Sequence, residues 1–272
     1  MKRVLKAVAK KLGVEVRRSP KRVDLPPAEK KPEPFGGKVL AWPPSANFDN
    51  IALVLHYFTQ AKPGSVFVQV GANDGETSDS VHRFVKLGTM RSVLIEPMPA
   101  TFAKLRAFYA GINGVDLVQA AIAPTVGVAT IHSVYDRGRW LGNTWATQLA
   151  SFDREHLLRH GILEDEIESS EVECLDFATL LRRQGLDRID VLQVDVEGYD
   201  AEVVRMALEL PTPPLVICFE FVQFVKSMDQ RAVNSFYDQL RSKGYAWSHD
   251  RINTMAVHKD FVISGEPAPQ DR

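Results

Sequence analysis

Residues 66–77 have the sequence VFVQVGANDGET, and this stretch decides the fold. The apolar run Val66–Val70 ends at Gly71, crosses a short turn to Gly75 and meets residues that favour the start of a helix. Such a run is typical of a buried parallel strand, and open α/β sheets bind nucleotide-like ligands where such a strand turns into a helix. The stretch therefore predicts both a fold class and the position of a ligand site.

The same alternation of strands and helices continues through the rest of the chain. The expected helices span residues 49–60, 78–87, 99–109, 176–184, 199–208 and 230–243. The expected strands span residues 66–70, 92–96, 115–122, 126–135, 172–175, 189–194, 215–221, 245–248 and 254–258. This order predicts an α/β fold, a Rossmann-like, doubly wound and mainly parallel sheet with an antiparallel strand pair at its C-terminal end.

The charges are unevenly distributed along the 272 residues, although the net charge is only −1. Residues 1–34 contain 11 Lys and Arg against 4 Asp and Glu, so the remainder is acidic and a poor nucleic-acid binder. We expect a basic arm and proline-rich linker at 1–46, the Rossmann-like domain at 47–262 and a tail at 263–272. The arm fits contact with an anionic membrane surface or a protein, but we favour the interpretation as a frayed basic extension.

Cys174 and Cys218 are the two cysteines, and each lies in an apolar, strand-like run. Two cysteines cannot form a disulfide framework, so we expect buried free thiols in a reducing compartment. No apolar run is long enough to span a bilayer, and lysines interrupt the apolar residues of the N-terminus. These features predict a cytoplasmic protein, with any membrane contact peripheral.

The turn after the first strand excludes two common phosphate sites. A dinucleotide fingerprint would need glycine at positions 73 and 76, where the chain has Asn73 and Glu76. A P-loop would need Gly-Lys-Ser/Thr after the turn, which Glu76-Thr77 does not supply. Asp74, Glu76 and Asp79 would also repel a diphosphate. The turn instead suits a cationic or zwitterionic ligand, and the sulfonium and ammonium groups of S-adenosylmethionine match this pattern.

Glu96 ends the second strand, 25 residues after Gly71. An acid near this spacing binds the ribose in dinucleotide folds, because a carboxylate accepts hydrogen bonds from both ribose hydroxyls. The alternative is an acid that caps the following helix, which begins near Pro97-Met98-Pro99. With the Gly71 turn upstream, we favour the ribose-binding role.

A third clue is the sequence VLQVDVEGY at residues 191–199. This apolar strand runs into Asp195 and Glu197 at its carboxyl end, which faces the same crevice as Gly71 and Glu96 in a parallel sheet. Either acid could instead be structural, Asp195 as a helix N-cap and Glu197 as a solvated loop residue.

The segments VGANDGETS, LIEPMPATF and DVLQVDVEGYDAEVV, in this order, resemble the FkbM-type methyltransferase family over about residues 50–260. That family comprises S-adenosylmethionine-dependent enzymes, mostly O-methyltransferases that act on hydroxyls of sugars, polyketides and other secondary metabolites. The chain departs from the family at Gln193, where lysine is frequent. The resemblance implies that Gly71, Asn73 and Gly75 line the methionine end of the cofactor, that Glu96 holds the ribose and that Asp195 borders the methyl-transfer site. The full set of expected cofactor-binding residues is Gln69, Gly71, Ala72, Asn73, Asp74, Gly75, Glu96, Pro97, Ala121, Ile122 and Asp195.

Methyl transfer requires an aligned nucleophile, exclusion of water and, for a hydroxyl acceptor, removal of a proton. We expect Asp195 to contact a small-molecule or glycan acceptor, with Glu220 beside it and His132 as a further candidate base. A divalent cation could bind these carboxylates, but no metal site is predicted. A nucleotide-dependent oxidoreductase and a non-catalytic binding domain are the alternatives. The aperiodic segment 136–160 is a candidate acceptor-binding insertion.

Overall fold

The structure is a computed structural model that describes residues 50–77, 79–135, 139, 146, 148–221, 229–250 and 252–261. The basic arm, the proline-rich linker and the C-terminal tail that the sequence predicts lie outside these residues, as does part of the 136–160 segment.

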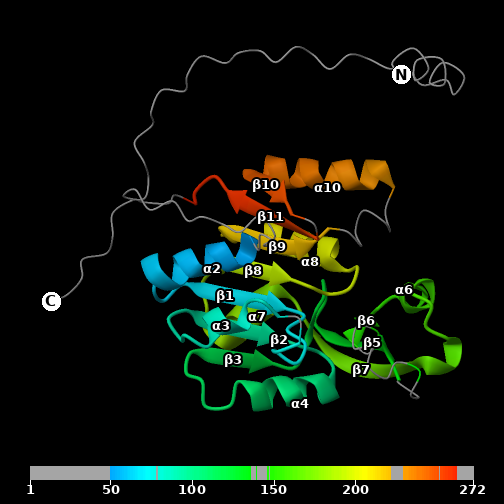
Figure 1. Ribbon diagram of the computed structural model, residues 1–272. Coiled ribbons are helices and arrows are strands. Elements are labelled where there is room, and N and C mark those ends of the chain that lie inside the picture. The colour runs from blue at the N-terminus through cyan, green and yellow to red at the C-terminus, as the bar shows by residue number, and fades with distance from the viewer. Residues whose placement is uncertain are drawn as a thin grey trace, which may run out of the picture. The chain divides into compact units, whose positions relative to one another are not determined.

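The central sheet has seven strands. Five of them are parallel, namely β1 (Val66–Val70), β2 (Arg91–Ile95), β3 (Val115–Val118), β8 (Val191–Val194) and β9 (Val216–Glu220). The antiparallel pair β10 (Tyr245–His249) and β11 (Asn253–His258) extends the sheet beyond β9. The strand order is β10-β11-β9-β8-β1-β2-β3, which runs from top to bottom in Figure 1. The predicted mainly parallel α/β sheet with a C-terminal antiparallel pair is confirmed.

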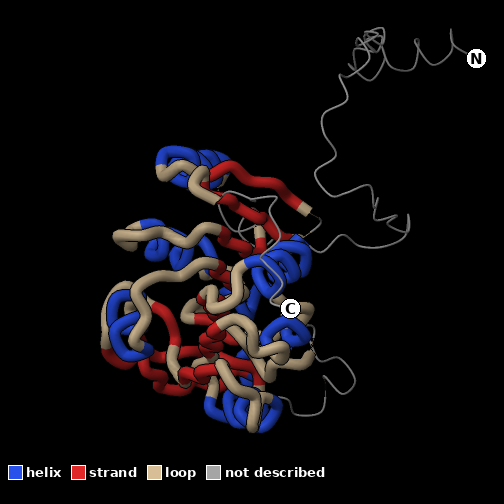
Figure 2. The backbone as a smooth tube through the Cα atoms, turned by 90° about the vertical axis from the view of Figure 1, so that its left-hand side faces the viewer, coloured by secondary structure: helices blue, strands red, loops and turns tan. Residues whose placement is uncertain are grey.

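Helices cover both faces of this sheet (Figure 2). The helices on one face are α2 (Asn50–Ala61), α3 (His82–Val85) and α4 (Pro99–Phe108). Those on the other face are α7 (Phe177–Gln184), α8 (Asp200–Leu208) and α10 (Gln230–Ser242). Successive side chains of a strand point to opposite faces, so Phe67 packs in the first core and Val68 in the second.

Two predicted elements differ from the structure. The helix expected at 78–87 is reduced to α3, because the Asp79 carboxylate accepts a hydrogen bond from the Val81 amide (2.7 Å) and so competes with helical hydrogen bonding. The single strand expected at 115–122 is two strands, β3 and β4 (Ala121–Ile122). β4 leaves the central sheet and pairs with another strand.

A second, four-stranded sheet lies beside the first (Figure 1). Its strands are β4, β5 (Gly127–Val134), β6 (Ala150–Ser151) and β7 (Ile167–Leu175), in the order β4-β7-β5-β6. Between β6 and β7 the chain forms the short helix α6 (Arg154–Arg159) and the 3-10 turn η1 (Glu164–Glu166). The sequence predicts β5 but only the last residues of β7, and it does not predict that the two form a separate sheet.

Cys174 in β7 and Cys218 in β9 are both buried, and no disulfide joins them, as the sequence predicts. Within the described part of the chain, no helix combines the length and the apolar character needed to cross a bilayer.

Candidate active site

A cavity of about 540 Å³ opens at the carboxyl ends of the parallel strands. Ile131 and Ser133 of the second sheet also line it, so the cavity is bounded by residues of both sheets. Its lining includes these predicted site residues: Gln69, Gly71, Ala72, Asn73, Glu96, Pro97, Ala121, Ile122, Asp195 and Glu220. The three sequence segments singled out above therefore meet in one cavity, and the ligand roles of their residues stay predictions.

Gly71 allows the turn after β1 to approach the loop after β8. Its φ is +83°, and a Cβ atom built on it would lie 1.8 Å from the backbone carbonyl oxygen of Asp195. The amides of Gly71 and Ala72 both donate to the carbonyl oxygen of Ile95, at 3.0 and 2.9 Å. Only glycine combines this backbone conformation with so close an approach. The residue thus brings the β1, β2 and β8 ends together.

Gly75 and Asp74, two predicted cofactor residues, shape the turn and do not line the cavity. A Cβ atom on Gly75 would lie 2.7 Å from the Tyr109 ring, so this glycine allows the turn to pack on the residues at the end of α4. The Asp74 carboxylate accepts hydrogen bonds from the Thr77 amide (2.7 Å) and the Glu76 amide (3.0 Å). Burial raises the pKa of Asp74, but these hydrogen bonds outweigh it and hold the pKa below its usual value.

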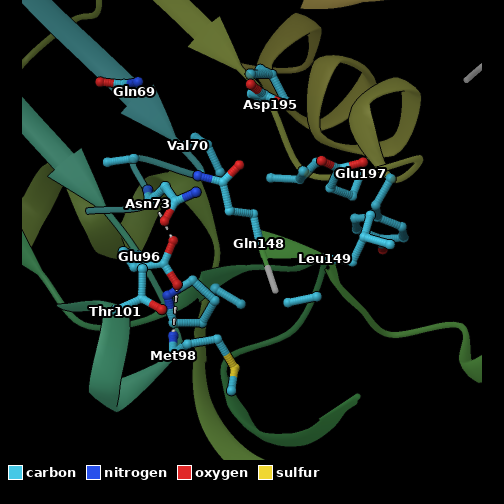
Figure 3. Close-up of a pocket in the computed structure, with 18 of the residues that line it drawn as sticks. Gln69, Val70, Asn73, Glu96, Met98, Thr101, Gln148, Leu149, Asp195 and Glu197 are labelled. Carbon is cyan, nitrogen blue, oxygen red and sulfur yellow. Dashed lines mark hydrogen bonds between the residues drawn. The ribbon is translucent and has the colours of Figure 1, made fainter. Parts of the chain in front are cut away.

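Glu96 is held by two backbone amides at the other side of the turn (Figure 3). Its Oε2 accepts from the Asn73 amide at 3.1 Å and its Oε1 from the Met98 amide at 2.9 Å. Burial raises the pKa of Glu96 to about 7, against the effect of these two hydrogen bonds, and the charge of Asp74 raises it further. Each carboxylate oxygen keeps a lone pair for another donor. Glu96 therefore orders the start of α4 and can still bind a ligand.

Asp195 and Glu197 lie across the cavity from Glu96, in the loop after β8 (Figure 3). Glu197 has φ +50°, and Asn73 on the facing turn has φ +48°. These are the non-glycine residues with positive φ in the described part of the chain, and both line the cavity. Sparsely populated backbone conformations of this kind concentrate at functional sites.

Asp195, Glu197 and the neighbouring carboxylates of the cavity raise one another's pKa values. Burial among protein atoms raises the pKa of Asp195 to about 6, although its side chain is open to the cavity, and the charge of Asp79 contributes. Burial raises the pKa of Glu197 to about 8, with contributions from Asp195 and then Glu220. Two neighbouring carboxyl groups thus titrate on opposite sides of neutral pH.

Asp200 is a buried acid that the sequence analysis does not identify. Its side chain accepts hydrogen bonds from the amides of Gly198 (3.2 Å) and Glu220 (3.3 Å), and the residue is 1% exposed. It therefore ties the loop after β8 to the end of β9. An acid in the first turn of a helix is common, so nothing in the sequence separates Asp200 from an exposed one.

We expect Asp200→Ala to lower the free energy of unfolding by about 1–3 kcal/mol, because two amides lose their acceptor in a buried place. Urea denaturation followed by circular dichroism measures this loss. Glu202→Ala removes an acid of the same helical turn whose partner is Arg205 on the surface, and should change stability by less than about 1 kcal/mol. Equal losses of stability in the two variants would contradict the role of Asp200 in joining the loop after β8 to the end of β9.

His132 does not lie with the carboxylates. Ile131, Ser133 and Val134 of β5 line the cavity, and His132 is not among the lining residues. Its Nδ1 lies 2.8 Å from the Ser169 hydroxyl oxygen. The structure therefore gives His132 no place in the cavity lining, and its role as a base stays a prediction from the sequence.

Two glutamines at the cavity floor have unsatisfied amide oxygens. Gln69 of β1 and Gln193 of β8 are paired in register, so their side chains share a face of the sheet. Gln69 is 3% exposed, and its Nε2 donates to Asp79 at 3.4 Å. Within the described structure, neither Oε1 atom has a hydrogen-bond partner. Buried acceptors of this kind need an explanation, and a bound donor supplies one.

The described residues contain no group of three or more His, Cys, Asp or Glu side chains arranged to hold a metal ion. The described lining of the cavity combines carboxylates, amides, hydroxyl groups and apolar surface with the ammonium group of Lys104.

Comparison with known proteins supports one family. Residues 69–257 match the family model of the methyltransferase FkbM domain. No protein of curated function matches the chain.

The chain is also similar to solved methyltransferase structures. The precorrin-6y C5,15-methyltransferase of Geobacter metallireducens GS-15 is 12% identical, with a TM-score of 0.41 and coverage of 79% of this chain and 90% of that chain. Fibrillarin of Aeropyrum pernix, solved with S-adenosyl-L-methionine bound, is 10% identical, with a TM-score of 0.38 and coverage of 76% and 73%. These likenesses are too weak to assign any residue. The family match, by contrast, spans more than half of the chain, and the chain therefore belongs to the FkbM methyltransferase domain family.

Proposed function

We propose that this chain is an S-adenosylmethionine-dependent methyltransferase that methylates a hydroxyl oxygen of a sugar, a glycan or a secondary metabolite. The observation that supports the proposal is one cavity with two kinds of carboxylate. Glu96, which can accept hydrogen bonds from ribose hydroxyls, lies at one side, and Asp195 and Glu197 lie at the other. Family membership supports methyl transfer, and the resemblance described above supports a hydroxyl acceptor.

The residues fit the cofactor. Glu96 has lone pairs for the ribose hydroxyls, and Ala121 and Ile122 offer apolar surface to the adenine. The turn at 71–73 would hold the methionine end, where the neighbouring carboxylates favour an ammonium and a sulfonium over a phosphate. When bound, S-adenosylmethionine supplies a methyl group already activated by the positive sulfur.

Asp195 is the proposed general base. With a pKa of about 6 it is mostly ionised at neutral pH, so it can accept the proton of an acceptor hydroxyl. Glu197, with a pKa of about 8, keeps its proton at the same pH and can donate a hydrogen bond to the acceptor. Glu220 at the end of β9 lies on the same lining and helps to position this pair.

Calorimetric titration with S-adenosylhomocysteine and transfer of a labelled methyl group to a panel of hydroxyl compounds test the proposal. We expect the wild-type protein to bind S-adenosylhomocysteine, and Asp195→Asn to keep that binding but to lose at least about 100-fold in turnover. Asp238→Asn makes the same chemical change on the exposed face of α10 and should keep turnover. Failure of the wild type to bind would refute the proposed function.

A non-catalytic binding domain is the second candidate, and Gln193, at a position where the family often has lysine, favours it. Binding of S-adenosylhomocysteine without transfer to any acceptor would support that reading. We further propose a cytoplasmic location and an acceptor other than nucleic acid. Peripheral contact with a membrane or a protein through the basic residues 1–34 is proposed from their charge alone.

A further inference from the structure

Glu197 has a backbone conformation that its surroundings must maintain. Its φ is +50°, and this left-handed region is unfavourable for a residue with a side chain. Such a conformation persists only where the surrounding structure fixes it. Before Glu197, the Asp195 amide donates to the carbonyl oxygen of Val70 at 2.9 Å and so ties the loop to β1. The loop also needs contacts after Glu197.

The segment around helix α6, which lies beside the second sheet (Figure 1), supplies contacts after Glu197. The His156 ring lies against Gly198, because a Cβ atom built on Gly198 would be 2.9 Å from Cε1 and 3.1 Å from Nδ1 of that ring. Four residues before His156, the Phe152 ring packs edge-on against Tyr199, with the ring centroids 5.5 Å apart. Two rings of one segment thus contact the two residues that follow Glu197.

Stability alone does not explain a histidine at position 156. The residue is 6% exposed, and its Nε2 atom has no hydrogen-bond partner in the described structure. Burial, and then the charges of His160 and Arg159, lower the pKa of His156 to about 4, so the ring is uncharged at neutral pH. A buried nitrogen without a partner is destabilising, a penalty that an apolar side chain would not carry. The ring therefore contributes its flat shape beside Gly198.

Helix α6 is itself attached to a wall of the cavity. Leu157, the residue after His156, is completely buried in a cluster that contains Val134 and Leu149. Val134 and Leu149 also line the cavity. His156 thus connects this wall with the loop that carries Glu197.

We propose, on the basis of the proposed function, that His156 is a positioning residue for methyl transfer. Its ring, packed on Gly198, keeps Glu197 and Asp195 in the arrangement that activates the acceptor hydroxyl. His156 is not among the residues that line the cavity, so it acts through the backbone of the loop and not by contact with a substrate. This role requires a flat ring at position 156 and no transferable proton.

Two substitutions of His156 separate positioning from proton transfer. His156→Ala removes the ring, and we expect kcat for the best hydroxyl acceptor to fall at least about tenfold, with the acceptor KM and the Kd of S-adenosylhomocysteine unchanged within about threefold. His156→Phe keeps a flat, uncharged ring and should keep kcat within about threefold of the wild type. Equal losses of kcat in the two variants would overturn the positioning role.

Glu155→Ala is the matched control. Glu155 is the neighbour of His156 in α6, and its side chain is exposed. Its substitution should leave kcat unchanged. A fall in kcat as large as that of His156→Ala would show that any change in α6 has this effect, which would overturn the specific role of the ring.

Hydrogen exchange tests the contact without any acceptor. The Gly198 amide donates to the Asp200 carboxylate at 3.2 Å, and the Tyr199 amide donates to the carbonyl oxygen of Val196 at 3.4 Å. In His156→Ala we expect the peptide that contains these two amides to exchange about tenfold faster, while a peptide from α10 is unchanged. An unchanged loop peptide, or equal acceleration in both peptides, would contradict a local contact.

A double-mutant cycle measures the coupling between the ring and Gly198. Gly198→Ala strains the backbone in any background, because the φ of Gly198 is +93°. Only where the His156 ring is present does the new Cβ atom also meet ring atoms. We expect Gly198→Ala to lower the urea midpoint at least about twice as much in the wild type as in His156→Ala. Equal shifts would overturn the contact.

The outcomes separate this proposal from the proposed function. If the wild type does not bind S-adenosylhomocysteine, or binds it without transfer to any acceptor, the proposed function fails and the positioning role fails with it. If the wild type transfers the methyl group and His156→Ala keeps the same kcat, only the positioning role is overturned.

Discussion

Gly71→Ala is expected to lower the free energy of unfolding by about 2–5 kcal/mol and to abolish binding of S-adenosylhomocysteine. A left-handed backbone costs an alanine about 1–2 kcal/mol, and overpacking in a tight place costs about 1–3 kcal/mol more. The new Cβ atom would lie 1.8 Å from the carbonyl oxygen of Asp195, so the turn and the loop after β8 would have to separate. Urea denaturation and calorimetry measure the two effects.

Gly111→Ala is the matched control. Gly111 has φ +76°, close to the +83° of Gly71, but a Cβ atom there would meet nothing within 4 Å. Its substitution should therefore cost only the backbone strain of about 1–2 kcal/mol and leave S-adenosylhomocysteine binding intact. If both variants lose the same stability and both keep binding, the close approach of the two loops is not what Gly71 provides.

Glu96→Ala is expected to weaken S-adenosylhomocysteine binding by about 1.5–3 kcal/mol, which corresponds to roughly 10- to 150-fold in affinity. The loss reflects hydrogen bonds from the ribose hydroxyls to a charged acceptor. Glu76→Ala removes an exposed acid of the same turn that does not line the cavity, and should change the binding free energy by less than about 1 kcal/mol. An unchanged affinity in Glu96→Ala would remove this residue from the cofactor site.

The pH dependence of the same titration has a defined sign. The pKa of Glu96 is about 7 in the free protein, and hydroxyl donors favour its ionised form, so affinity should rise as the pH increases towards 7 and level off above it. Glu96→Ala should flatten this rise.

The stability of the free protein should respond in the opposite direction. Between 4.5, the usual pKa of the group, and about 7, folded Glu96 keeps a proton that the unfolded chain releases. Stability therefore falls with rising pH in that window, and urea denaturation across it measures the change.

The central sheet is readable from the sequence because its strands are short runs of buried apolar residues. Val66–Val70 and the residues before Asp195 are mostly apolar, so these segments are expected to be buried strands. An acid that follows such a run must lie at the carboxyl end of the parallel strands. Glu96 and Asp195 are predicted for that reason. The local sequence pattern is therefore enough to predict a strand when helices cover both faces of that strand.

The remaining features depend on contacts between distant parts of the chain. The exposed residues of β7 resemble a polar loop until the strand is paired with β5. Which residues of β5 line the cavity also depends on this pairing, and His132 is not among them. Gly75 packs on the end of α4 and Gly71 on the β8 loop, although both are glycines of the same turn. Asp200 is identified only by the two amides that it binds.

The second sheet provides one wall of the cavity, yet its strands hydrogen-bond with one another and not with β1 or β8 in the described structure. Substitutions at Ile131 or Ser133 can thus alter the shape of that wall without disturbing the register that holds Gly71 beside Asp195. The proposed cofactor contacts of Gly71, Asn73 and Glu96 therefore do not depend on the side chains of β5. Evolution, or an engineer who changes those side chains, can reshape this wall and leave the contacts in place, provided that β7 keeps its pairing with β4, where the proposed adenine contacts Ala121 and Ile122 lie.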